Sequence, residues 1–314
     1  MNMDVENNLN GFDEFPSVEY LFRPTSSRIK RDVGNEMEIF TTRTRQVVQY
    51  MGDKGFNKML VEEETNGLLC ESITEIKTLP IGRDPLSDSI AFQTFYTTVD
   101  EFYNTAQEVN AKVTFDSYDK RTGHTAGNHV HISGNGIEDL MEVARIMQVY
   151  NPFIIVLANP DNQNNTRRAL EFGYKNRIGI AYNPSGKLKN KKNDILIDMR
   201  NGLVEDRIIP MSKDLNTAYM IPQLLHRLIS MAESDPEEML KIEYLTNESP
   251  DGVSTYAEIN RNRAIMDGLK AILYDVKFVM ENGSLKAISY ERHISEIIDE
   301  YLTKVGDYQQ FVFD

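Results

Sequence analysis

The chain has almost no cysteine and no long apolar run. Cys70 is the only cysteine among 314 residues, so an internal disulfide framework is excluded. The first residues are polar and acidic rather than basic and then apolar, so we expect no secretory signal and predict a reducing, cytoplasmic compartment. The longest apolar run, residues 153–158, is much shorter than the roughly 18 residues of a membrane helix. We therefore predict no membrane span and no membrane partner.

The chain also has fewer basic than acidic residues. Lys and Arg number 34 against 48 Asp and Glu, which gives a formal net charge of -14. Because nucleic-acid phosphates are bound by clustered Lys and Arg, we predict that neither DNA nor RNA is a partner. One local exception is the basic, glycine-containing segment at residues 186–193. Its composition favours a solvated turn and leaves open a loop that closes over phosphates.

The sequence lacks internal repeats, Ser/Gly-rich linkers and a Gly-x-Gly-x-x-Gly turn. The missing glycine turn argues against a dinucleotide-binding parallel sheet. With 40% hydrophobic residues, the chain can bury the core of one large domain. We predict an acidic arm over residues 1–28 that is poorly ordered or peripheral, a catalytic domain over 29–233, and a helical C-terminal extension over 234–314 that packs on the same domain.

Apolar periodicity gives the expected elements of the first two thirds. Helical spacing predicts a helix over residues 136–150 that ends before Pro152, and Thr98 is expected to cap another helix. Alternating or apolar runs predict strands over residues 33–40, 72–79, 112–118 and 194–209.

Prolines and glycines give the expected boundaries of the last third. Pro222 and Pro236 are expected in the first turns of two helices. Residues 237–306 are predicted to be mostly amphipathic helix, with Gly283 and Gly306 as terminators. The pattern as a whole predicts a single α+β domain.

The most distinctive segment is Gly-Asn-His-Val-His-Ile-Ser at residues 127–133, which places two imidazoles and a hydroxyl at alternate positions. In a strand these three side chains share one face, while Val130 and Ile132 point to the other. Glu36 and Glu38 form a similar alternating pair between apolar residues. One such pair alone is typical of an ordinary solvated strand face.

Recurrence of this pattern favours a binding site. Charged residues also alternate with apolar ones in residues 71–77, 198–200 and 205–210, so we predict that several strands share one concave, charged sheet face. Oxygen ligands outnumber nitrogen ligands there, which favours Mg²⁺ or Mn²⁺ over structural zinc. Arg200 and Arg207 are expected to face the same way and to hold phosphate or carboxylate oxygens. A metal with arginines is typical of phosphoryl transfer.

Four segments in chain order resemble the glutamine synthetase fold family. Residues 129–133 resemble its His-x-His-x-Ser signature, and Glu-x-Glu at 36–38 resembles its paired metal-binding glutamates. Residues 205–210, followed by 214–219 and a helix, are similar to its Glu-x-Arg strand. Residues 74–80 are similar to the Glu-Ile-x-Thr-Pro-Pro element of glutamate-cysteine ligases, with one proline instead of two. The pattern resembles the short carboxylate-amine ligases, or amidoligases, many of them encoded by phages and bacteria.

This resemblance implies an α+β fold in which a curved, mainly antiparallel sheet forms a half-barrel with helices packed outside. It implies ATP and Mg²⁺ or Mn²⁺ as cofactors, and small-molecule or peptide carboxylates and amines as substrates that are joined through an acyl phosphate. The expected metal ligands are Glu36, Glu38, Glu75, His129 and Glu205. The residues expected to contact the nucleotide are His131, Ser133, Arg207, Arg177 and Lys187. The residues expected to act in catalysis are Glu205, Arg207 and Arg200.

Several alternatives stay open at this point. Asp198-x-Arg200 competes with Glu205-x-Arg207 for one role, and we favour the second pair because an Asp-Leu-Asn-Thr-Ala-Tyr stretch and a helix follow it. Other readings are a guanidino kinase, a metal-dependent hydrolase, and a non-catalytic protein that keeps the ligase fold and binds a partner. The oligomeric state is also open, a homo-oligomer included. If a phage encodes the chain, the expected compartment is the host cytoplasm.

Overall fold

The computed structural model describes residues 31–63, 73–82, 85–117, 125–158, 180–183, 194–212 and 215–306. Several predictions lie outside these residues and are not addressed by it: the N-terminal arm, Cys70, Arg177, Lys187 and the basic segment 186–193.

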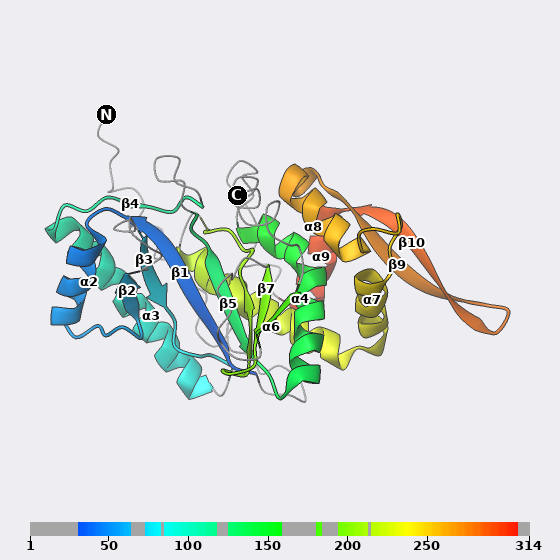
Figure 1. The fold of residues 1–314 in the computed structure, drawn as a ribbon, viewed down its shortest axis with the longest axis horizontal. Helices are drawn as coiled ribbons and strands as arrows, with labels where there is room; N and C mark the ends of the chain where they lie inside the picture. The colour runs from blue at the N-terminus through cyan, green and yellow to red at the C-terminus, as the bar shows by residue number, and fades with distance from the viewer. Residues whose placement is uncertain are drawn as a thin grey trace.

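Within the described residues the centre of the fold is an eight-stranded sheet with the strand order β2-β3-β1-β5-β8-β7-β6 and with β4 paired to β1 (Figure 1). All neighbouring strands are antiparallel except β6 and β7. This confirms an α+β protein with a mainly antiparallel sheet, whereas closure into a half-barrel stays a prediction. The strands are β1 (Val33–Thr41), β2 (Val61–Glu63), β3 (Ile73–Lys77), β4 (Val113–Thr114), β5 (Asn128–Ser133), β6 (Ile180–Asn183), β7 (Ile195–Asp198) and β8 (Leu203–Asp206).

Helices cover one face of this sheet. Apolar residues on that face, such as Met37, Ile76 and Val130, are fully buried, and in β1, β3 and β5 they alternate with charged or imidazole side chains on the other face. Helices α3, α4 and α6 pack on the strands, and α6 lies behind β5 and β7 in Figure 1. The helices are α2 (Thr44–Asp53), α3 (Pro85–Glu108), α4 (Ile137–Ala158), α6 (Leu215–Ser234), α7 (Pro236–Asn247), α8 (Tyr256–Asp267), the short η3 (Gly268–Lys270) and α9 (Ile294–Val305).

Helix α4 corrects one predicted boundary. It was expected to end before Pro152, but it continues through this proline to Ala158. A proline removes one backbone hydrogen bond, yet the apolar residues that follow it are buried in the main core, and this packing outweighs the local cost. Among the described residues α4 alone is long and apolar enough to cross a membrane, and 78% of its most apolar window is buried inside the protein, as in a core helix.

Other helix starts also differ from the prediction. Thr98 lies inside α3, where its hydroxyl donates to the carbonyl of Thr94 instead of capping the helix. Pro222 lies inside α6 rather than in its first turn. Asp235 does cap the helix that begins at Pro236, as predicted. The predictions for Thr98 and Pro222 fail for one reason. In α3 and in α6 the apolar face that packs on the sheet begins before the residue that was expected to start the helix.

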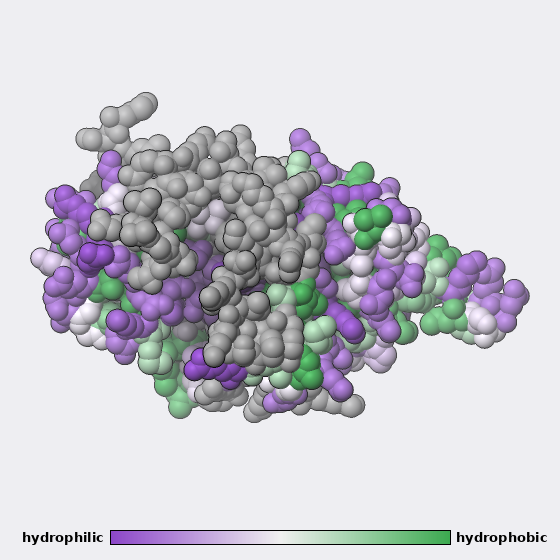
Figure 2. Space-filling model, in the orientation of Figure 1, coloured by the Kyte–Doolittle hydropathy of each residue, from purple (hydrophilic) through white to green (hydrophobic). Residues whose placement is uncertain are grey.

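The C-terminal third contains a long hairpin that the sequence analysis missed. Strands β9 (Ile272–Glu281) and β10 (Ser284–His293) pair along their whole length, so the prediction of mostly helix over 237–306 is wrong here. Asn282 and Gly283 join them with φ of 53° and 81°. Asn-Gly is a strong signal for a two-residue hairpin turn. The hairpin projects from the body of the protein in Figure 1, and Figure 2 shows both hydrophobic and hydrophilic residues on it.

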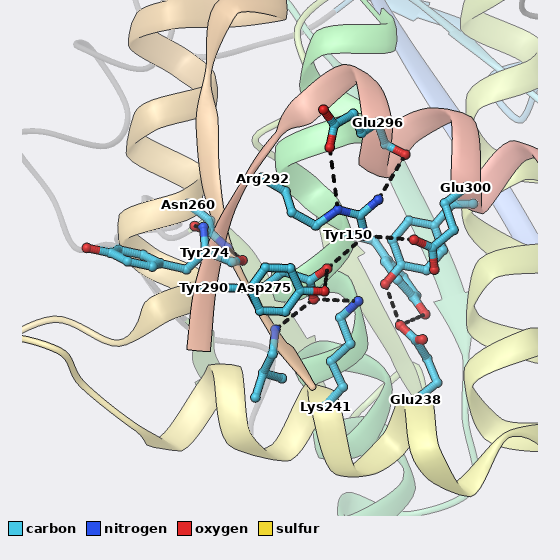
Figure 3. A network of polar contacts seen from close by, with 12 residues as sticks. Tyr150, Glu238, Lys241, Asn260, Tyr274, Asp275, Tyr290, Arg292, Glu296 and Glu300 are labelled. Atoms are coloured by element: carbon cyan, nitrogen blue, oxygen red, sulfur yellow. Dashed lines mark hydrogen bonds and ion pairs between the residues drawn. The ribbon is translucent and has the colours of Figure 1, made fainter. Parts of the chain in front are cut away.

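A buried carboxylate fixes the base of this hairpin (Figure 3). Asp275 of β9 lies 2.8 Å from Lys241 Nζ of α7 and 2.9 Å from an Arg292 guanidinium nitrogen of β10. Next to it, Glu238 of α7 accepts hydrogen bonds from the hydroxyls of Tyr150 and Tyr301. These contacts join α4, α7, α9 and the hairpin into one unit.

Candidate functional site

The register of three strands builds a cluster of charged side chains on the sheet face opposite the helices. In the pairing of β1 with β5, Glu36 lies opposite His129, and in the pairing of β1 with β3, Glu38 lies opposite Glu75. Directly opposed residues of antiparallel strands share a face. One ligand atom each from Glu36, Glu75 and His129 lies within 4.8 Å of the other two. We call these three residues the candidate metal centre.

The carboxyl group of Glu75 shows how crowded this centre is. Glu75 is 7% exposed. Burial, the charge of Glu36 and a hydrogen bond with Glu62 raise its pKa from 4.5 to about 10. The ionised form of this group is therefore unfavourable unless a cation lies beside it.

A lysine lies among the same carboxylates. The Nζ atom of Lys77 lies 2.6 Å from Glu62, 3.5 Å from Glu36 and 3.6 Å from Glu75. Burial works against the charge of this ammonium, but the hydrogen bond to Glu62 and the charges of Glu36 and Glu75 outweigh burial and raise its pKa. Lys77 is therefore the resident positive charge of this part of the site.

Strand β8 and the residue after it add a glutamate and an arginine beside the two histidines. Glu205 Oε1 lies 2.9 Å from Arg207 Nε, 3.6 Å from His129 Nδ1 and 4.0 Å from His131 Nε2. The Nε2 atom of His131 is also 3.6 Å from Glu36. The predicted ligands on β1, β3, β5 and β8 thus form one continuous cluster.

Two further predicted site residues are engaged with the backbone of the protein. Glu38 Oε2 accepts a hydrogen bond of 2.7 Å from the backbone of Gly127, and its Oε1 atom lies 3.6 Å from His129 Nε2. The hydroxyl of Ser133 accepts a hydrogen bond of 2.8 Å from the backbone of Asp32. Both residues border the cluster, and both help to hold β5 in place.

The structure separates the two competing Asp/Glu-x-Arg pairs. Asp198 lies at the turn between β7 and β8, where it accepts hydrogen bonds from the backbone of Arg200 and the side-chain amide of Asn201. Arg200 is exposed in this turn, whereas Arg207 is half-buried against Glu205. The second pair, not the first, therefore contacts the histidines.

Sequence reasoning gave no role to Lys77 or Glu62, although both touch the cluster. Lys77 follows Glu75 at the alternate position of the same strand and belongs to the segment 71–77 that was predicted to lie on the charged face, so a role in the site could have been inferred. Glu62 lies on a strand of three residues, which is too short to show a period.

The fold and the site together define an α+β protein with a candidate divalent-cation centre on the sheet face opposite the helices. No protein-family model matches the chain, and no curated protein sequence matches it. Among solved structures it is similar to glutamine synthetase of Plasmodium falciparum, determined by cryo-electron microscopy, with 13% sequence identity and a TM-score of 0.45. The match covers 77% of this chain and 58% of the Plasmodium chain, so this chain spans less than two thirds of that enzyme.

Proposed function

We propose that this protein is an ATP-dependent carboxylate-amine ligase that uses Mg²⁺ or Mn²⁺ and forms an amide or peptide-like bond through an acyl phosphate. The observation that carries the proposal is the convergence of Glu36, Glu75 and His129, whose ligand atoms lie within 4.8 Å of one another. These residues come from three of the four segments that resemble the glutamine synthetase fold family, and the fourth segment places Glu205 and Arg207 beside them.

The donor set fits the proposed cation. Two carboxylates and one imidazole suit Mg²⁺ or Mn²⁺, which prefer oxygen ligands. Glu36, Glu75 and His129 would hold the ion, with Glu205 at the border of the centre. When bound, such an ion neutralises the charge of the transferred phosphoryl group. The closeness of Glu36 and Glu75 also fits this role, because their ionised forms repel each other until a cation lies between them.

Positively charged residues around the centre would reduce the electrostatic repulsion between two anionic substrates. Both ATP and a carboxylate carry negative charge, so fixed positive charge is needed before their oxygens can approach. The guanidinium of Arg207 is fixed by Glu205 at the edge of the cluster and supplies such a charge. His131, between Glu36 and Glu205, is placed to contact nucleotide or substrate.

The proposal includes an organisation of the chain into a catalytic domain and a C-terminal extension. Residues 29–233 would form the catalytic domain, and residues 234–314 an extension on the same domain. Contacts of α7 with α4 and α6, and of α8 with α4, support the packing of this extension on the same domain. The substrates would be small-molecule or peptide carboxylates and amines, and the reaction would take place in the cytoplasm.

The test is an ATP-dependence assay with a matched pair of variants. Purified protein is given ATP, Mg²⁺ and a panel of carboxylates and amines, and ADP, phosphate and amide products are quantified by mass spectrometry. We expect turnover only with nucleotide, and a loss of about 100-fold or more in Glu36→Gln. Glu63→Gln is the control, because Glu63 lies on β2, one position from Glu62, and contacts Arg45 instead of the cluster.

Two results would contradict the proposal. Consumption of a substrate without ATP would favour a metal-dependent hydrolase. No release of ADP or phosphate with any pair of substrates, together with no binding of Mg²⁺ or Mn²⁺, would favour a non-catalytic protein with the same fold.

A further inference from the structure

The ammonium of Lys77 uses the same oxygens as the candidate metal centre. Its Nζ atom lies 3.5 Å from Glu36 and 3.6 Å from Glu75, which are two of the three proposed ligands. Its side chain is 22% exposed, so the charge is only partly screened by water. Two cations, the ammonium of Lys77 and a divalent ion from solution, would therefore compete for the same two glutamate side chains.

The third partner of Lys77 lies outside the metal centre. Glu62 on β2 makes the shortest contact, 2.6 Å, and lies opposite Glu75 in the pairing of β2 with β3. The backbone of Lys77 is fixed by its hydrogen bond to the carbonyl of Leu60. Only the long, flexible side chain can therefore move, and Glu62 offers it a partner when Glu36 and Glu75 are taken by another cation.

We propose that Lys77 is an internal counter-ion that competes with the divalent cation for Glu36 and Glu75, and that Glu62 holds its ammonium when the cation binds. This inference rests on the proposed function, because it concerns the same centre. It identifies Lys77 and Glu62 as residues that set the affinity and occupancy of the site without binding the ion. Lys77 weakens divalent-ion binding, and Glu62 strengthens it by drawing the lysine away.

The experiment measures Mn²⁺ binding to the full chain by isothermal titration calorimetry and by the electron paramagnetic resonance signal of free Mn²⁺. Lys77→Met removes the competing charge, and we expect Mn²⁺ to bind about tenfold tighter or more. Glu62→Gln leaves the ammonium to Glu36 and Glu75 alone, and we expect weaker binding. Lys77→Arg keeps the charge and is expected to bind Mn²⁺ like the wild type. Circular dichroism and thermal melts establish that each variant is folded.

The two key variants break the same ion pair but are expected to shift the affinity in opposite directions. If the Lys77–Glu62 pair only supported the local structure, both variants would shift it in the same direction, and that result would overturn the inference. The control for net charge is Lys286→Met, an exposed lysine on the hairpin strand β10, which we expect to change the affinity less than threefold.

The outcomes separate this inference from the proposed function. Binding to the wild type with equal or weaker binding to Lys77→Met would overturn the role of Lys77 and leave the metal centre intact. Binding to Lys77→Met but not to the wild type would support the competition in its strongest form. Absence of binding in every variant would overturn both.

Discussion

Replacing Glu75 with glutamine tests whether the cluster is built for a cation rather than for stability. Burial and the charge of Glu36 raise the pKa of Glu75 from 4.5 to about 10. In the unfolded chain this carboxyl group is ionised at pH 7, and in the folded protein without metal it must take up a proton. Each pH unit between these values costs about 1.4 kcal/mol, so the folded state loses at most roughly 3 kcal/mol at pH 7 relative to a neutral side chain.

The sign of the pH dependence follows from this linkage. Between pH 4.5 and pH 10 the folded state binds a proton that the unfolded state lacks, so the free energy of unfolding falls as pH rises. Glutamine is neutral in both states. Without metal, Glu75→Gln should therefore melt higher than the wild type at pH 7, by at most roughly 5 °C for a chain of this length, and the difference should grow as pH rises.

A bound cation should offset most of this difference. A ligand at about 100 times its Kd adds about 2.7 kcal/mol to the free energy of unfolding, or roughly 4 °C here. Glu75→Gln lacks one ligand and should lose most of this gain. The assay is differential scanning fluorimetry in EDTA and in millimolar Mg²⁺ or Mn²⁺ at several pH values.

The control is Glu63→Gln, which should respond to the cation like the wild type. The reasoning is refuted if Glu75→Gln melts below the wild type in EDTA over the whole pH range, or if it keeps the full shift with Mg²⁺ or Mn²⁺.

Three more predictions concern the scaffold. Burial and nearby positive charge lower the pKa of His226 to about 4, so the free energy of unfolding should fall by up to roughly 3 kcal/mol as pH drops from about 6.5 to 4, and His226→Gln should flatten this dependence in urea titrations. Gly283→Ala places a side chain at φ 81° and should cost about 1 kcal/mol in the same titrations, whereas Ser284→Ala should be neutral. Asp275→Asn removes the buried carboxylate shared by Lys241 and Arg292, of which Arg292 keeps its contact with Glu300, and should cost roughly 2 kcal/mol by thermal melts.

Each of these three has a result that would contradict it. An unchanged pH dependence in His226→Gln, equal losses in the two turn variants, or a melting temperature of Asp275→Asn equal to that of the wild type would show that the stated contact does not carry the effect. Divalent-cation binding should be unchanged in Asp275→Asn, because its network lies at the base of the hairpin.

The alternation of polar and apolar residues was enough to predict which side chains share the charged face. Glu36, His129 and Glu205 each follow or precede a fully buried apolar residue, namely Met37, Val130 and Val204, so their direction follows from the strand period. The Asn282-Gly283 pair is a sequence signal for a hairpin turn, but the amphipathic pattern around it was interpreted as helix. Pro152 shows the opposite case, because a valid local stop signal was outweighed by core packing.

The sequence by itself determined the α+β class and the acidic, imidazole-containing strand face, because both follow from local periods of two and 3.6 residues, whereas the antiparallel pairing was expected only from the family resemblance. Only the tertiary structure decided the register that brings Glu36, Glu75 and His129 together and that sets Lys77 between Glu62 and two of these ligands. It also decided that Arg207, and not Arg200, stands beside the histidines. The strand register and the position of Arg207 depend on pairing between residues far apart in the chain, which cannot be predicted from a short-range sequence pattern.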